Sequence, residues 1–132
     1  MEVKAVRVLV VDDQMPFRNA AKTVVRVTPG FEVVGEAESG ERAVELAAEL
    51  SPDLVLMDIN LPGIDGIEAL RRITAAQPET IGFLVSTIKE NDLPADARTC
   101  GAAAYISKED FEPSILQRLW ESRGDAAWRD GS

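Results

Sequence analysis

The sequence contains no histidine and a single cysteine, Cys100, among its 132 residues. Without histidine, the chain cannot build a Ser-His-Asp triad, use histidine for acid–base catalysis or carry phosphohistidine. One cysteine and no histidine cannot form an internal disulfide or a zinc site, and we interpret Cys100 as a small buried hydrophobe. Any chemistry must therefore rely on carboxylates, hydroxyls, lysine or a hard metal ion.

Long apolar runs and an excess of positive charge are also missing. The apolar stretches are of strand length and the first residues do not resemble a signal peptide, so we expect no transmembrane helix and a cytoplasmic location. The formal net charge of −9 argues against direct binding to nucleic acid, whose phosphates repel an acidic surface. The chain length and the ordinary balance of apolar and charged residues are typical of one globular domain.

Strand-like and helix-like segments alternate along the chain. Runs rich in β-branched residues at 5–11, 32–37, 53–57, 81–85 and 103–106 predict five strands. Segments with helical spacing follow each of them, and the last two helices are expected at about 91–100 and 110–122. This alternation predicts an α/β fold, a flavodoxin-like doubly wound parallel sheet of order 2-1-3-4-5 with five helices. We assign the domain to residues 1–124 and expect residues 125–132 to be a disordered tail.

Polar residues stand where the predicted strands end. Asp12 and Asp13 follow the first strand, Asp58 the third, Ser86 the fourth and Lys108 the fifth. Each has an ordinary structural explanation, as a helix cap, a turn-former, a backbone-bonded hydroxyl or a solvated lysine. In a doubly wound sheet, however, ligands bind beyond the carboxyl ends of the strands, near the point where the strand order reverses. The joint occurrence of these residues therefore favours one shared site.

The three aspartates suggest a cation at this site. Carboxylates that crowd together repel one another and raise one another's pKa unless a positive charge compensates them. Oxygen ligands of this kind suit Mg²⁺, which uses few protein carboxylates and keeps several waters. A nearby lysine can pair with a carboxylate or with a phosphoryl oxygen.

The ordered set of motifs resembles the receiver domain of two-component response regulators, of the single-domain type of the chemotaxis response regulator. The resemblance extends from residue 6 to about residue 122 and is highly specific as a set. The matching segments are Val10-Val11-Asp12-Asp13, Leu54-Val55-Leu56-Met57-Asp58, Leu61-Pro62-Gly63-Ile64-Asp65-Gly66, Phe83-Leu84-Val85-Ser86 and Gly101-Ala102-Ala103-Ala104-Tyr105-Ile106-Ser107-Lys108.

The resemblance implies a role for each aspartate. Asp58 would be the nucleophile that accepts a phosphoryl group from the phosphohistidine of a histidine kinase or phosphotransfer protein. Asp13, Asp58 and the backbone carbonyl of Asn60 would bind Mg²⁺, and Asp12 would act partly through water.

The same resemblance assigns the remaining polar residues. Lys108 would bind a phosphoryl oxygen, Ser86 would hydrogen-bond the phosphoryl group, and Tyr105 would be the aromatic switch that moves with Ser86. Two positions depart from the family pattern. Thr87 stands where alanine or glycine is usual, which would narrow access to Asp58, and Glu109 stands where proline is common.

We therefore expect a phosphorylation-dependent signalling switch. It would not be an enzyme, except that it would catalyse its own phosphorylation and dephosphorylation. With no output domain in the sequence, it would signal through a protein partner, or a second copy in a homodimer, on the face of the fourth helix, fifth strand and fifth helix. A degenerate receiver that acts without phosphorylation, and a phosphorelay intermediate, remain alternatives within the family.

Two other protein classes fit less well. A phosphatase of the haloacid dehalogenase type needs an Asp-x-Asp pair after its first strand, and Asp12-Asp13 is not that pair. A flavodoxin-like cofactor binder needs a phosphate-cradling loop there, and the two aspartates would repel phosphate instead.

Overall fold

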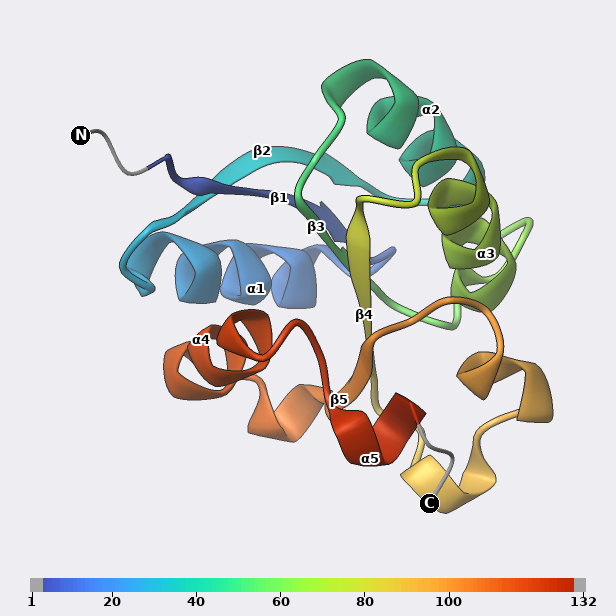
Figure 1. Ribbon diagram of the computed structural model, residues 1–132. Helices are drawn as coiled ribbons and strands as arrows, with labels where there is room; N and C mark the ends of the chain where they lie inside the picture. The colour runs from blue at the N-terminus through green and yellow to red at the C-terminus, as the bar shows by residue number, and fades with distance from the viewer. Residues whose placement is uncertain (1–3, 130–132) are drawn as a thin grey trace.

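The computed structural model describes residues 4–129, in which parallel strands form one sheet of order β2-β1-β3-β4-β5 (Figure 1). This arrangement confirms the predicted flavodoxin-like α/β fold and its strand order. Over these residues the sheet consists of β1 (Val6–Val11), β2 (Phe31–Ala37), β3 (Leu54–Met57), β4 (Ile81–Ser86) and β5 (Ala104–Ser107).

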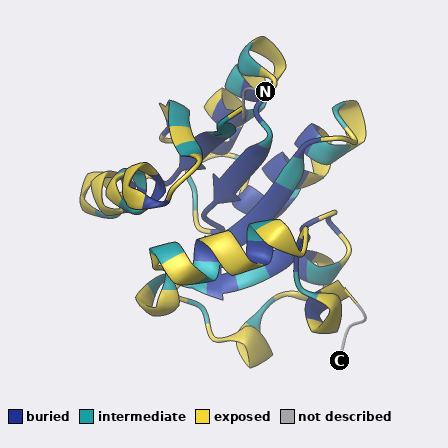
Figure 2. Ribbon diagram, turned by 60° about the vertical axis from the view of Figure 1, so that its left-hand side comes forward, coloured by how far each residue is buried: buried dark blue, intermediate teal, exposed yellow. Residues whose placement is uncertain are grey.

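Helices cover both faces of the sheet. On one face lie α1 (Met15–Val27) and α4 (Pro113–Glu121), and on the other α2 (Gly40–Leu50) and α3 (Gly66–Ala76) (Figure 1). Because successive side chains of a strand point to opposite faces, Val8 and Val10 pack with α1 and α4, whereas Leu9 and Val11 pack with α2 and α3. Figure 2 shows the result: the strands are buried between two layers of helices, whose outward faces are exposed. No helix within residues 4–129 has the length and apolar character to cross a bilayer.

The start of α3 positions the loop that follows β3. Asp65 caps this helix, because its side chain accepts a hydrogen bond from the backbone N–H of Glu68. The next residue, Gly66, donates its N–H to the carbonyl of Ile59 at 2.8 Å. A Cβ at Gly66 would lie only 1.7 Å from the carbonyl oxygen of Asp58. The absence of a side chain there lets the helix lie directly against the loop carrying Asp58.

The prediction of an α-helix at residues 91–100 was wrong. The chain forms two 3-10 turns there, η1 (Glu90–Asp92) and η2 (Ala95–Arg98), instead of one α-helix. Pro94 has no N–H to continue a helix, and Leu93 before it takes an extended conformation. The last long helix also begins later than expected, at Pro113, because residues Lys108–Asp110 form a third 3-10 turn, η3.

The expected disordered tail is a second correction over part of its length. Residues Ala126–Arg129 form a short helix, α5, beside β5 (Figure 1). Its Trp128 side chain is buried in the core on the α2–α3 side of the sheet, only 3% exposed. Four residues are too few for a helical pattern to show in the sequence, so this anchor was missed. Residues 130–132 of the expected tail lie outside the described residues.

The close approach at Gly66 predicts a large effect of a small substitution. We expect Gly66→Ala to lower the free energy of unfolding by more than about 3 kcal/mol, because its methyl group would overlap backbone that cannot move freely. Gly30→Ala is the matched control, since nothing lies within 4 Å of its added Cβ and only its φ of +85° is unfavourable. This control should cost about 1 to 2 kcal/mol in urea denaturation. Equal losses for the two variants would contradict the packing argument.

Candidate functional site

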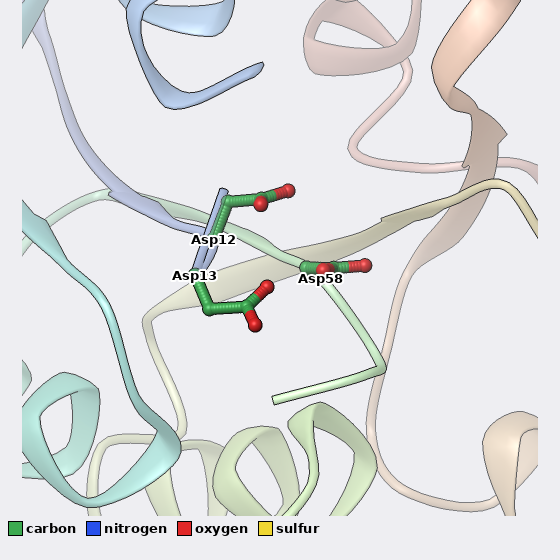
Figure 3. A group of neighbouring side chains, drawn as sticks. All are labelled: Asp12, Asp13 and Asp58. Atoms are coloured by element: carbon green, nitrogen blue, oxygen red, sulfur yellow. The ribbon is translucent and has the colours of Figure 1, made fainter. Parts of the chain in front are cut away.

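Three carboxylates converge where β1 and β3 end. One oxygen from each of Asp12, Asp13 and Asp58 lies within 4.8 Å of the others (Figure 3). The two strands are neighbours in the sheet, and the N–H of Asp58 donates to the carbonyl of Val11 at 3.0 Å. Asp12 and Asp58 are buried, whereas Asp13 is exposed. The strand order therefore places the aspartates at its point of reversal, with an open side at Asp13.

Lys108 brings a positive charge to this cluster from the far edge of the sheet. Its Nζ lies 2.7 Å from Oδ2 of Asp12 and 3.6 Å from Oδ2 of Asp58. The ammonium group also lies 4.4 Å from the centroid of the Phe17 ring, a cation–π contact from α1. Its peptide bond to Glu109 is trans, as are the others in residues 4–129. One ammonium among three carboxylates leaves the cluster negatively charged when all groups are ionised.

The carboxylate of Asp12 has spare capacity for a cation. Its Oδ1 accepts a bond from the N–H of Gln14 at 2.8 Å, whereas its buried Oδ2 accepts no hydrogen bond from the described residues and has only the ion pair with Lys108. Neither Asp12 nor Asp13 caps α1, because Gln14 occupies that position without a side-chain bond. An incompletely paired buried oxygen beside two further carboxylates fits a hard divalent cation such as Mg²⁺. Asn60 follows in the loop after Asp58, with an exposed side chain.

The buried position of Asp58 shifts its protonation. Burial, and after it the negative charge of Asp12, raise the pKa of the Asp58 carboxyl group, which lies at about 6 when all influences are combined. The positive charge of Lys108 and a 2.8 Å bond from the N–H of Ile59 act in the opposite direction and favour the carboxylate. Without a metal ion, Asp58 thus exchanges its proton close to neutral pH. A cation at the three carboxylates would favour the ionised form.

Ser86 and Tyr105 are linked through the segment that follows β4. The buried Ser86 hydroxyl accepts a bond from the N–H of Ile88 at 3.3 Å. The hydroxyl of Tyr105 donates to the backbone carbonyls of Ser86 and Ile88. A movement of the backbone at Ser86 or Ile88 would therefore alter the hydrogen bonds of Tyr105. Thr87 is exposed, and its effect on access to Asp58 stays a prediction.

Arg18 is a positioning residue that the sequence reasoning missed. Its guanidinium donates to the backbone carbonyl of Asp12 and to the carboxylate of Glu36 on β2, both at 2.8 Å. The side chain is buried, although arginine rarely is unless it is paired. The available signal was its spacing, since Arg18 lies on the same helical stripe as the buried Ala21 and Val25.

Comparison with known proteins assigns the chain to a family. The family model for the response regulator receiver domain matches residues 8–119 of the chain. The chain belongs to this family. The receiver resemblance seen in the sequence motifs is thereby confirmed.

Individual relatives agree with this assignment. The response regulator GacA of Pseudomonas aeruginosa is 40% identical over 103 residues, which cover 78% of this chain and 48% of GacA. The chain therefore spans about half the length of this relative. The receiver domain of CheB from Thermotoga maritima is similar in structure, with a TM-score of 0.80, 32% identity and coverage of 91% of this chain and 97% of that one.

A further structural relative was crystallised with a phosphoryl mimic. This is the CheX–CheY–BeF3–Mg²⁺ complex from Borrelia burgdorferi, with a TM-score of 0.76, 28% identity and 90% coverage of both chains. The BeF3 and Mg²⁺ belong to that complex, and the same reagents can be used to probe this receiver.

The raised pKa of Asp58 predicts a pH-dependent stability in metal-free buffer. Between about pH 4 and pH 6 the unfolded chain ionises Asp58 while the folded protein retains the proton, so stability falls as pH rises through this window. Asp58→Asn should abolish this loss and raise the free energy of unfolding by about 2 to 3 kcal/mol at pH 7, with no gain below pH 4. Denaturant unfolding in EDTA measures it. Asp92→Asn, at an exposed position on η1, is the control and should change little.

Proposed function

We propose that this receiver is a Mg²⁺-dependent phosphorylation switch that accepts a phosphoryl group on Asp58. The donor would be the phosphohistidine of a histidine kinase or phosphotransfer protein. The observation that carries the proposal is the buried Asp58 carboxylate, which lies beside the ammonium group of Lys108 and the carboxylates of Asp12 and Asp13. We also propose a cytoplasmic location and no direct contact with nucleic acid.

The proposed reaction moves one phosphoryl group between two proteins. A carboxylate oxygen of Asp58 attacks phosphorus, a new O–P bond forms, the N–P bond of the donor breaks, and its imidazole leaves. Asp12, Asp13, Asp58 and the carbonyl of Asn60 would hold Mg²⁺, which neutralises negative charge on the carboxylate and phosphoryl oxygens.

Two residues would bind the oxygens of the phosphoryl group once it is on Asp58. Lys108 now pairs most closely with Asp12, and its ammonium group would turn to a phosphoryl oxygen, to which it is attracted as a point charge. The Ser86 hydroxyl would donate to another phosphoryl oxygen and give up its bond from Ile88. Because Tyr105 is bonded to the same segment, phosphorylation would change the surface around β5.

That surface is the proposed output face, made of the η1–η2 segment, β5 and α4. A groove of about 290 Å³ lies on it between β5 and α4, lined by Tyr105 and Ile115. Acidic side chains also line the groove, from residues Glu109, Asp110, Glu112 and Asp125. These charges favour a basic segment of a partner protein, because complementary charges speed and direct association. Dimerisation with a second copy through this face is the alternative to test.

Phosphorylation by acetyl phosphate tests the central claim. With Mg²⁺ present, the protein should gain one phosphoryl group by intact mass, and hydroxylamine should remove it, as expected for an acyl phosphate. Asp58→Asn should gain none, because the side-chain amide of asparagine, unlike a carboxylate, is not a nucleophile toward phosphorus. Asp92→Asn should be phosphorylated like the wild type. A modified Asp58→Asn protein would show that the acceptor lies elsewhere.

Binding of Mg²⁺ can be tested separately from phosphorylation. A ligand that binds only the folded protein stabilises it by mass action, by about 1.4 kcal/mol at a concentration ten times its dissociation constant. Mg²⁺ should therefore raise the melting temperature of the wild type and of Glu38→Gln, which changes an exposed residue after β2. The rise should disappear in Asp13→Asn. An undiminished rise in that variant would remove Asp13 from the ligand set.

A further inference from the structure

The chain after α4 turns sharply and runs back to β5. Arg123 and Gly124 both have positive φ, of 54° and 124°. The N–H of Gly124 donates to the carbonyl of Leu119 at 2.8 Å, and that of Asp125 to the carbonyl of Ala103 at 2.9 Å. A Cβ at Gly124 would lie 2.5 Å from the same carbonyl of Ala103. This turn therefore directs the next residues along the edge strand rather than away from the domain.

Trp128 fastens the segment to the domain by several contacts. Its indole N–H donates to the carbonyl of Ala102 at 3.1 Å. The guanidinium of Arg98, on η2, lies 4.3 Å from the ring centroid and donates to the carbonyl of Trp128 at 3.0 Å. Asp125 begins the helix by accepting the N–H of Ala127 at 3.0 Å. The burial of the tryptophan and the pairing of its indole N–H describe a specific docking site for residues Asp125–Arg129.

The docked tryptophan touches the proposed switch directly. Its ring stacks on that of Tyr105, with centroids 5.9 Å apart and an interplanar angle of 29°. The Tyr105 hydroxyl is bonded to the carbonyls of Ser86 and Ile88, and the Ser86 hydroxyl accepts the N–H of Ile88. A continuous series of contacts thus runs from Trp128 to the Ser86 hydroxyl, which would hydrogen-bond the phosphoryl group on Asp58.

We propose that residues Asp125–Arg129 form a latch that is closed over the output face in the unphosphorylated receiver and released by phosphorylation of Asp58. The inference rests on the proposed function and adds its regulation. When Ser86 turns to the phosphoryl group, the carbonyls that hold Tyr105 shift and its ring leaves the plane on which Trp128 stacks. A helix of four residues does not persist without such an anchor. Its release uncovers Tyr105 and opens the groove between β5 and α4, of which Asp125 lines one side while the latch is closed.

Thermodynamic reciprocity makes the latch measurable at the distant site. If phosphorylation weakens the latch, then removal of the latch strengthens the binding of a phosphoryl mimic by the same factor. Trp128→Ala should lower the half-saturating concentration of beryllofluoride, measured by ¹⁹F NMR in excess Mg²⁺, by about five-fold or more. Arg98→Met leaves the tryptophan in place but removes its cation and hydrogen bond, and should shift the titration in the same direction by less. Trp120→Phe is the control and should titrate like the wild type. Trp120 contacts Phe31 and Arg123 and not Tyr105, and phenylalanine keeps an aromatic ring in its place.

Fluorescence follows the latch itself. The sequence has two tryptophans, so Trp128 is the only one left in Trp120→Phe. Adding beryllofluoride and Mg²⁺ to this variant should move its emission to longer wavelength and increase quenching by acrylamide, because a buried indole becomes exposed. The same addition to the double variant Trp120→Phe, Asp58→Asn should have no effect.

The outcomes separate the latch from the function on which it rests. If ¹⁹F NMR shows a filled site while Trp128 emission and quenching stay unchanged, the latch is wrong and the proposed function stands. A Trp128→Ala protein that melts cooperatively but binds the mimic equally or more weakly also overturns the latch. If the wild type binds no beryllofluoride at all, the proposed function and the latch fall together.

Discussion

Electrostatic repulsion among three carboxylates is the constraint around which this domain is organised. An apolar sheet alone gives no reason to gather Asp12, Asp13 and Asp58 within 4.8 Å, since burial and mutual repulsion both disfavour their ionised forms. The ammonium group of Lys108, contributed by the residue that follows β5, offsets part of this cost. The remaining negative charge would attract a cation to the site. The same repulsion that destabilises the ionised cluster would therefore favour the binding of a cation there.

The fold restrains one side of this cluster more firmly than the other. On the rigid side, Arg18 holds the backbone at Asp12, and the start of α3 lies against the carbonyl of Asp58. On the other side, Ser86 leads into two short 3-10 turns with a single buried side chain, Ala97. Segments with few buried contacts open at low free-energy cost, whereas packed helix starts do not. We therefore expect a charge added at Asp58 to move mainly the segment that begins at Ser86 and continues into these two turns.

The sequence was sufficient for the framework and for the aspartates because both depend on simple rules. Buried parallel strands read as β-branched runs, and their carboxyl ends must meet at one edge whatever the details of packing, so Asp12, Asp58 and Lys108 could be brought together on paper. Tertiary contacts decided the rest. Arg18 can be buried because Glu36 on β2 and the backbone carbonyl of Asp12 both pair with its guanidinium. Pro94 divided an expected helix whose spacing looked adequate, and Trp128, a lone aromatic in a polar stretch, had no periodicity to reveal its docking site.

The energetics of that docking site are suited to regulation. Burial of a tryptophan removes about 150–250 Å² of surface from water, which contributes about 4 to 6 kcal/mol at ~25 cal/mol per Å². Ordering the four residues of α5 costs about 4 to 8 kcal/mol of backbone entropy. The two quantities nearly cancel, so the balance is set by the stacking on Tyr105 and the contacts from Arg98. A ligand-linked free energy of about 1 to 3 kcal/mol, the usual size of coupling between sites, is then enough to open or close the segment. A longer helix with several anchors would stay docked in both states, and a tail without the tryptophan would dock in neither.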